Sequence, residues 1–369
     1  MRHRRVLAAV LAGLVGPLTA TAPPDLADFA TLGGLLLEGR LGEVYAPAWN
    51  QAGPLQLLIS RLLLVGGADG VPAPLVTALV DGAAVVAAMA LCGRLTADRG
   101  AVLARRELVA GLLTLLWLAA PLPWNGHPAE LAVPACWAYA IVLQRRNRCA
   151  AAAAVLAIAV AIAPWGVLGL PCLLAAGRPR AALAAATAGS VLGAAVYLPF
   201  VLTGQFAMFG HRWGVAAGSL PHLLGLHEIT WWFRLLQAVL VAGGCALVAW
   251  HGRGERPAIA TAPLAAALLR TATDPLALSY YWFPVAVASL LLIALVPATA
   301  DRRTRALAVL LGYLALLAEA SGWTLPGAVA CLAVLAAAQR TRGPSSLRKR
   351  TVPTSLRAEA TRLRAGTAG

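Results

Sequence analysis

The 369-residue chain contains few charged side chains, with 15 acidic residues and a single lysine among its 30 basic residues. Charged residues make up 12% of the chain, against about 25% in soluble domains, and the mean hydropathy is +0.75. This composition excludes an ordinary soluble domain. P-loop, H-E-x-x-H and Rossmann patterns are absent too, so nucleotide hydrolysis, zinc proteolysis and NAD chemistry have no support in the sequence.

Cysteine is scarce and scattered. The six cysteines lie in or beside apolar segments, with neither C-x-x-C nor Cys/His spacing. Such positions are typical of small core residues rather than of disulfides or zinc ligands.

Long apolar runs dominate what remains. Only helices satisfy their own backbone hydrogen bonds in lipid, so these runs predict an all-α polytopic membrane protein of about 12 transmembrane helices. They occupy residues 1–338, and an Arg-rich tail over 339–369 is expected to be disordered in the cytoplasm. The apolar segments are 6–22, 73–92, 107–121, 128–143, 149–163, 165–176, 181–202, 233–250, 257–271, 280–298, 304–319 and 322–338.

The basic residues predict the topology. If the N-terminus is cytoplasmic and the segments alternate, 25 of the 30 basic residues fall on the inner side, which is the positive-inside bias. Both termini are then cytoplasmic in the cell membrane. Residues 1–22 also resemble a cleavable signal peptide, an alternative that leaves the following loop outside. Pro164-Trp165-Gly166 divides the stretch 150–176, which favours a shallow hairpin returning to the cytoplasm.

The first outer loop, about residues 23–72, is the longest. Asp25 and Asp28 open it, directly after the first hydrophobic segment. A helix over 26–37, capped by Asp25 and ended by Gly39, is expected to follow. The stretch 54–65 is largely apolar but broken by Gln56 and Arg61, which is typical of a helix lying in the membrane interface.

Residues in this loop carry a family resemblance. The order Asp25…Phe29…Gly39…Tyr45…Gly53-Pro54-Leu55 resembles the GT-C superfamily of membrane glycosyltransferases. More narrowly, it is similar to the actinobacterial polyprenyl-phosphate-mannose-dependent mannosyltransferase-like proteins. Gly126-His127 and Tyr280-Tyr281 also stand where such proteins carry outer-loop polar and aromatic groups. Two features depart from the pattern: Phe29 replaces a common Tyr, and Gln51-Ala52 replaces a frequent aromatic residue or proline.

The resemblance implies a reaction. Such enzymes transfer a sugar, here favoured to be mannose, from a polyprenyl phosphate to a glycan or glycolipid acceptor at the outer face, with inversion. A carboxylate accepts the proton of the attacking hydroxyl, and Asp25 or Asp28 would do so. Because the leaving group is a lipid monophosphate, no obligatory metal or other cofactor is expected. Nucleic acid is not expected as a partner either, because the arginines are divided among short inner loops. An outer arginine or histidine would stabilise the phosphate.

The other outer-loop polar and aromatic residues are candidates for substrate binding. Each also has a structural explanation, such as a helix cap, a first-turn charge, a snorkelling arginine, a turn or the aromatic belt. The candidates are Arg61, His127, Glu130, His211, Arg212, Asp274, Tyr280 and Tyr281.

One acid falls inside an apolar segment. Asp81 is costly there and is expected to bond a neighbouring helix or to line a pathway. It keeps open a second function, a transporter or flippase of a lipid-linked sugar or other polar lipid. Transporters usually contain matched halves, and this sequence shows no internal repeat. An assembly protein or an inactive relative of the enzymes is a further alternative.

Overall fold

The protein is almost entirely helical in the computed structural model, which describes residues 2–20, 22–95, 99–119, 126–296 and 302–340. Every apolar segment expected from the sequence coincides with a helix, apart from a few end residues. The all-α prediction is therefore confirmed for the described chain. The longer helices are α1 (Arg2–Thr19), α5 (Pro74–Leu95), α6 (Gly100–Thr114), α8 (Ala129–Arg145), α9 (Cys149–Ile162), α10 (Pro179–Ala195), α13 (Trp231–His251), α14 (Ala258–Thr273), α15 (Phe283–Leu295), α16 (Arg302–Ser321) and α17 (Thr324–Arg340).

Shorter elements connect these helices. A π-helix, η1, extends α6, and a 13-residue 3-10 helix, η2, follows α9. One two-stranded antiparallel sheet pairs Trp213 with Ile229. The short elements are α2 (Pro24–Leu37), α3 (Leu41–Val44), α4 (Pro54–Leu63), η1 (Leu115–Ala119), η2 (Pro164–Ala176), α11 (Leu198–Leu202), η3 (Met208–Gly210), β1 (Trp213–Gly214), α12 (Leu220–Leu223), β2 (Glu228–Ile229) and η4 (Ser279–Trp282).

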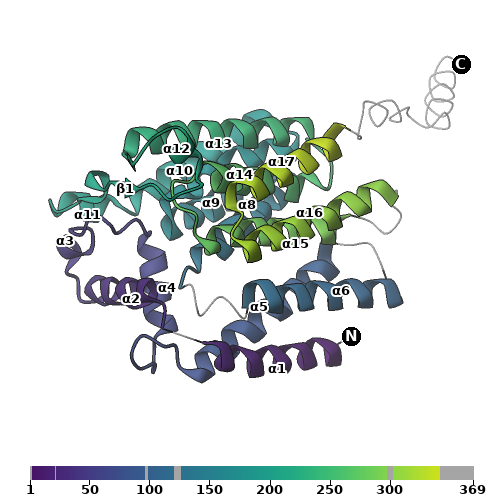
Figure 1. The fold of residues 1–369 in the computed structure, drawn as a ribbon, viewed down its shortest axis with the longest axis horizontal. Coiled ribbons are helices and arrows are strands. Elements are labelled where there is room, and N and C mark those ends of the chain that lie inside the picture. Colours follow the sequence, from purple (N-terminus) through teal and green to yellow (C-terminus); the bar gives the residue numbers. More distant parts are fainter. Residues whose placement is uncertain (1, 21, 96–98, 120–125, 297–301, 341–369) are drawn as a thin grey trace, which may run out of the picture.

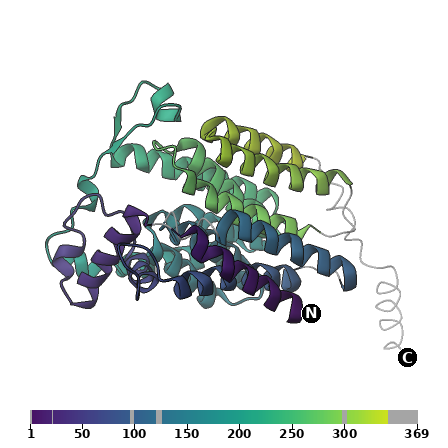
Figure 2. The same ribbon diagram turned by 60° about the horizontal axis from the view of Figure 1, so that its bottom comes forward.

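Helix α14 is the centre of the bundle. Nearly all of its residues are buried, and it packs against α8, η2, α13, α15 and α17. On one side α1, α5 and α6 lie together, and on the other α16 lies against α17 (Figures 1 and 2). A helix that is apolar on all sides belongs in the interior, as α14 does.

Three helices of the described chain are long and apolar enough to cross a membrane: Pro74–Gly93 in α5, Trp231–His251 in α13 and Arg302–Ser321 in α16. The α13 surface carries large exposed apolar side chains, among them Leu236 and Val239. Water would penalise such a surface, and lipid would not.

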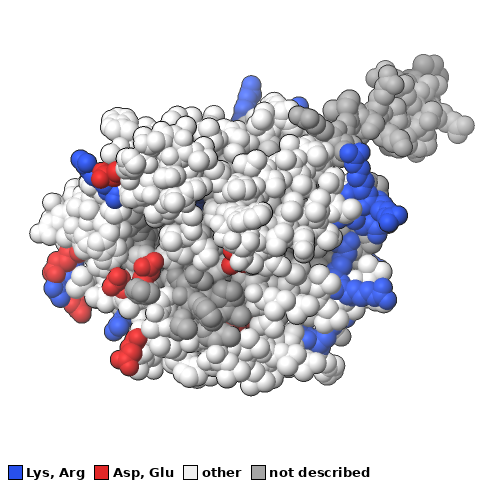
Figure 3. All heavy atoms as spheres, in the orientation of Figure 1, with Lys and Arg blue, Asp and Glu red and all other residues white. Residues whose placement is uncertain are grey.

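Charge divides the molecule along its long axis. Arginines gather at the end where the N-terminus, α6 and α16 begin, and acids gather at the opposite end, around α2 and α3 (Figure 3). The helices run between these two ends, so the charge separation expected from the sequence is present in three dimensions.

The short helices α2 and α3, from the long loop over residues 23–72, lie at the acidic end. Helix α2 begins at Pro24, so the expectation that Asp25 caps it is wrong: Pro23 is the N-cap, and Asp25 lies in the first turn. Proline suits the first helical turn because its missing N–H needs no partner there. Gly39 ends the helix as expected, with φ +74.

The predicted break in 150–176 is also present. Helix α9 ends at Ala163, which is extended (φ −152, ψ 135), and Pro164 begins η2. Trp137 fastens the break by donating from Nε1 to the Gly166 carbonyl oxygen at 2.9 Å. Gly177, with φ +78, then returns the chain toward α10.

All six cysteines are free thiols, as expected, and four of them are fully buried. The Sγ atoms of Cys172 and Cys245 lie 3.2 Å apart between η2 and α13. The tail over 341–369 lies outside the described residues.

Small residues let α1 and α5 cross closely. A Cβ on Gly82 would lie 3.2 Å from the Ala9 carbonyl oxygen, and one on Gly13 would lie 3.3 Å from that of Ala78. Asp81 faces Gly16 in this contact. Its two carboxyl oxygens are fully buried, with no hydrogen-bond partner among the described residues, so the expected bond to a neighbouring helix is not observed.

Glycine also sets the spacing of α9 and α10, which gives a stability prediction. A Cβ on Gly193 would meet the Val160 side chain at 2.5 Å, whereas one on Gly243 of α13 would meet nothing within 4 Å. We expect Gly193→Ala to destabilise the protein by about 1–3 kcal/mol through overpacking. Gly243→Ala should be neutral or stabilising by roughly 0.5–1 kcal/mol. Thermal unfolding in detergent measures both, and equal melting temperatures for the two variants would contradict the packing.

Candidate functional site

A cavity of about 490 Å³ opens at the acidic end of the bundle. Its walls come from α2, the loop before α4, the start of α8, η2, the β1 region and η4, so distant parts of the chain build it together. Acidic, aromatic and amide side chains dominate the lining. The lining residues are Asp25, Asp28, Phe29, Trp49, Gln51, Ala52, Gln56, His127, Glu130, Ala163, Trp165, His211, Trp213, Arg270, Leu276, Tyr280 and Tyr281.

Asp25 and His127 form the polar contact at the mouth of this cavity. His127 Nε2 lies 2.7 Å from Asp25 Oδ2. An ionised carboxylate only accepts hydrogen bonds, so Nε2 is the donor. The imidazole stacks on Tyr280, with centroids 3.8 Å apart and planes at 16°, and meets the Phe29 ring edge-on. His127 is thus held on two sides and fixes one oxygen of Asp25.

This hydrogen bond favours the charged form of Asp25. It holds the pKa of the Asp25 carboxyl below its usual value, against a smaller opposing effect of partial burial. About half of the Asp25 side chain remains exposed. Asp25 is therefore an ionised carboxylate with access to the cavity.

Asp28 follows one turn later on α2 and is exposed. It lines the same cavity, three residues from Asp25, on the same side of the helix. The two candidate carboxylates therefore share one site but differ in their contacts, because the bond to His127 is made by Asp25.

A buried ion pair forms the floor. Arg270 donates from Nη1 to Glu130 Oε2 at 2.5 Å and from Nη2 to Oε1 at 2.9 Å. The guanidinium carbon lies 4.0 Å from the ring centroid of Trp165 and 4.7 Å from that of Tyr281. A bidentate carboxylate and neighbouring aromatic rings stabilise the charged form of a buried guanidinium.

A second cavity of about 210 Å³ adjoins the first. Trp165, Trp213 and Arg270 line both, and the second lies between η2 and α13, with an apolar wall from η2 and a mixed wall from α13 that includes Arg234 and Gln237. Near their junction Arg234 donates to Asp274 Oδ2 at 2.8 Å and lies over the Trp213 ring, 4.6 Å from its centroid. The nearby guanidinium of Arg234 and partial burial both lower the pKa of His211, burial being the larger cause.

The sequence candidates fall into three groups. Seven lie together in the larger cavity: Asp25, Asp28, His127, Glu130, His211, Tyr280 and Tyr281. Asp274 lines the adjoining cavity. The last two line neither cavity, because Arg61 is exposed on α4 and Arg212 makes an exposed ion pair with Glu228.

The structure also bears on the helix-terminus roles that the sequence offered for His127 and Glu130. The His127 side chain does not cap α8, since it is committed to Asp25 and Tyr280. Glu130 lies in the first turn of α8 but points to Arg270.

Sequence reasoning missed Arg270, Arg234 and Trp165. Arg270 stands within an apolar segment, and that isolated charge was itself a signal that it would face a partner rather than lipid. Trp165 was noted only for its place between Pro164 and Gly166. Its contact with Arg270 depends on the packing of η2 against α14, which the local sequence does not determine.

The described residues contain no group of three or more histidine, cysteine, aspartate or glutamate side chains placed to hold a metal ion. Comparisons with protein-family models, with curated proteins and with solved structures give no match for this chain. The site is therefore interpreted from its own geometry.

The floor of the cavity generates a stability prediction. Glu130→Gln leaves the buried Arg270 guanidinium without its counter-charge and should destabilise the protein by about 3–5 kcal/mol. Glu228→Gln, which breaks the exposed pair with Arg212, should change stability by less than about 1 kcal/mol. Thermal unfolding in detergent compares the two variants. If both lower the melting temperature by the same small amount, the result contradicts a buried ion pair between Glu130 and Arg270.

The mouth of the cavity generates a pH prediction. The pKa of Asp25 is lower in the folded than in the unfolded protein, so the His127 contact adds stability above the unfolded pKa and loses it as pH falls through the folded one. The difference in melting temperature between wild type and His127→Gln should therefore narrow on acidification.

Asp25→Asn provides the control, because it has no carboxylate to titrate. In the Asp25→Asn background, the change in melting temperature caused by His127→Gln should not narrow on acidification. If the difference in melting temperature between wild type and His127→Gln stays constant into strong acid, the contact with His127 does not favour the ionised form of Asp25.

Proposed function

We propose that this chain is a polytopic membrane glycosyltransferase. It moves a sugar, with mannose favoured, from a polyprenyl phosphate to a glycan or glycolipid acceptor at the outer face of the cell membrane. One observation carries the proposal: a cavity with two carboxylates at its mouth and aromatic walls adjoins a second cavity that has one apolar wall, formed by η2. A polar sugar and an apolar lipid tail need that combination.

The membrane placement follows from charge and apolar surface. About 12 helices cross the bilayer in this proposal, and both termini are cytoplasmic. The three long apolar helices and the gathering of arginines at one end support it. The cavity lies at the other, acidic end and so faces outward.

Asp25 serves as the general base. Its carboxylate accepts the proton of the acceptor hydroxyl while the hydroxyl oxygen forms a bond to the anomeric carbon from the face opposite the phosphate. The bond from that carbon to the phosphate oxygen breaks, and its electron pair leaves with the polyprenyl phosphate, so the configuration inverts. His127 holds Oδ2 of Asp25, which leaves Oδ1 to receive the proton. Asp28 is the alternative base.

The donor is bound across both cavities. The phosphate lies at their junction, within the field of Arg270 and Arg234. Both guanidiniums are already paired with carboxylates, so each is held in a fixed position and donates its remaining N–H groups to the phosphate. The first part of the lipid tail follows the apolar wall of η2, and the sugar packs on aromatic faces of the larger cavity.

Transport of a lipid-linked sugar or other polar lipid is the second candidate. Asp81 favours it, because its buried carboxyl lies in a membrane-length helix without a hydrogen-bond partner among the described residues. Carboxyls in such places often mark a translocation pathway. The cavity itself lies away from α5, and this favours the enzyme.

The test is transfer from a labelled polyprenyl-phosphate sugar by the purified protein in proteoliposomes. We expect Asp25→Asn to lower the transfer rate by roughly 10²- to 10⁴-fold, the usual contribution of a positioned base. Lipid binding should persist, since Asp25 lies at the mouth of the larger cavity rather than in the second cavity.

Asp69→Asn is the matched control. Asp69 is an exposed acid of the same loop outside both cavities, and asparagine tolerates its φ of +53 equally well. Its transfer rate should match wild type. If Asp28→Asn alone abolishes transfer, Asp28 is the base, and if wild type transfers no sugar from any donor, the transport candidate replaces the enzyme.

A further inference from the structure

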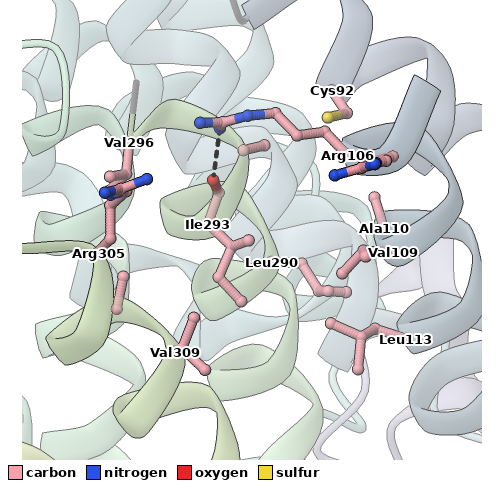
Figure 4. Close-up of a pocket in the computed structure, with 13 residues that line it drawn as sticks. Cys92, Arg106, Val109, Ala110, Leu113, Leu290, Ile293, Val296, Arg305 and Val309 are labelled. Carbon is pink, nitrogen blue, oxygen red and sulfur yellow. Dashed lines mark hydrogen bonds between the residues drawn. The ribbon is translucent and has the colours of Figure 1, made fainter. Parts of the chain in front are cut away.

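The cavities at the two ends of the bundle offer a ligand different polar groups. A cavity of about 240 Å³ at the arginine-bearing end lies between α6, α15 and α16, and its lining is aliphatic apart from a cysteine and three arginines (Figure 4). Arginine side chains donate hydrogen bonds and accept none. The larger cavity at the acidic end includes two amides, which do both: Gln51 from the loop before α4 and Gln56 from α4 itself.

Gln56 is a buried polar side chain without a protein partner. The residue is 3% exposed, and its amide makes no hydrogen bond with the described part of the chain. The amide nevertheless remains open to the cavity, in contrast to that of Gln144 on α8, which protein encloses completely and which also lacks a partner among the described residues. A buried amide without a partner is costly, so a ligand that bonds to Gln56 would recover that cost.

The start of α4 is held firmly. Gly53, the residue before the helix, donates from its backbone N–H to the Ile162 carbonyl oxygen at 3.0 Å, so closely that a Cβ at this position would clash with α9. Tyr45 Oη donates to the Ala52 carbonyl oxygen at 2.9 Å in a buried contact. Because these bonds fix the first turn of α4, the amide of Gln56 has a fixed place in the cavity wall.

The loop before α4 adds an acceptor and an aromatic ring. Gln51 Nε2 donates to the carbonyl oxygens of Ala48 at 2.8 Å and Met208 at 3.1 Å. Both N–H groups of this amide are thus used, and its Oε1 remains as an acceptor. Trp49, 44% exposed, places an indole ring in the same cavity. Amides beside an exposed ring suit a sugar, whose hydroxyls bond to the amides while its C–H face packs on the ring.

The charges in the cavity select against an anionic ligand. Among the lining residues Arg270 is the arginine, and it is paired with Glu130. Asp25 and Asp28 therefore leave the mouth with a negative potential, which disfavours a second anion such as a uronic acid. The sugar that fits this cavity is neutral.

We propose that Gln56 is a specificity-determining residue that recognises a neutral hexose, donating to one hydroxyl and accepting from its neighbour while the sugar packs on Trp49. Gln56 is buried and Asp25 lies at the mouth, so the hexose is the transferred sugar, held between the mouth and the second cavity. The inference rests on the proposed function for the role of this sugar as the donor's, but its hydrogen bonds are measured as binding, without any transfer.

The test measures binding of citronellyl-phosphate mannose, a short-chain donor, to the full chain in detergent by isothermal titration calorimetry. Analogues that each lack one hydroxyl, at the 2-, 3-, 4- or 6-position of the sugar, are compared with this parent compound. We expect wild type to bind at least one deoxy analogue about tenfold more weakly than the parent, which is the loss of about one neutral hydrogen bond. The 6-uronic acid analogue should bind more weakly as well.

Two variants locate the recognition. Gln56→Leu should bind the parent about tenfold more weakly than wild type, and it should bind the discriminating deoxy analogue as well as it binds the parent. Without ligand, it should melt at the same or a higher temperature than wild type, because the change removes an unpartnered amide. Gln144→Leu is the matched control: it makes the same change at a buried amide outside both cavities and should leave sugar selectivity unchanged.

Several results would overturn the inference. Equal weakening by Gln56→Leu for the parent and for every analogue would show that Gln56 supports the shape of the cavity and bonds to no hydroxyl. Unchanged binding throughout would show that its amide does not contact the sugar. A changed KM for the acceptor with unchanged donor binding would assign the amide to the acceptor. A wild type that binds neither this donor nor its glucose counterpart would also overturn it.

Transfer is measured separately, which distinguishes the two proposals. If wild type binds the donor with selectivity that depends on Gln56 but transfers no sugar to any acceptor, the enzyme proposal fails and the recognition by Gln56 stands. If Gln56→Leu transfers sugar with the selectivity of wild type, the enzyme stands and the role of Gln56 fails.

Discussion

The ion pair between Glu130 and Arg270 is the interaction on which the candidate site depends. It joins the first turn of α8 to the last turn of the central helix α14, in a place where neither charge would be stable alone. Because the guanidinium also lies against Trp165 and Tyr281, η2 and η4 take their positions from it. Four segments, α8, η2, α14 and η4, thus meet at one salt bridge, and sliding α8 or α14 would leave a buried charge uncompensated.

Two sites of different character follow from the charge separation along the bundle. At the acidic end the cavity is lined by carboxylates and rings, and at the arginine end a smaller pocket is lined by aliphatic side chains, a cysteine and three arginines. Helices crossing a bilayer expose polar side chains chiefly where they leave the hydrocarbon, so chemistry concentrates at the ends of the bundle. The middle, represented by α14, is packed with alanine and leucine.

The positions of the helices were largely predictable, because long apolar runs and the proline and glycine residues between them set helix limits directly. The grouping of Asp25 with His127 was not, since 102 residues separate them and only the packing of α2 against the α8 entrance joins them. Both had been singled out as outer-loop polar residues. Arg61 and Arg212 were also outer-loop polar candidates, yet they line neither cavity. Residue type and the expected side of the membrane therefore select candidates, but they do not predict which candidates lie together. The opposite error occurred at Arg270, which was not among the candidates although it lies in the site.

The 3-10 winding of η2 makes the segment longer than its number of residues suggests. Its 13 residues form a 3-10 helix, which rises about 2.0 Å per residue, so the segment is roughly 26 Å long. As an α-helix the same residues would extend only about 20 Å. The tighter winding therefore makes η2 about a third longer than an α-helix of the same residues. In a 3-10 helix residues three apart lie in one row, so Pro164 stacks with Val167 and Trp165 with Leu168, and these two rows form the apolar wall of the second cavity.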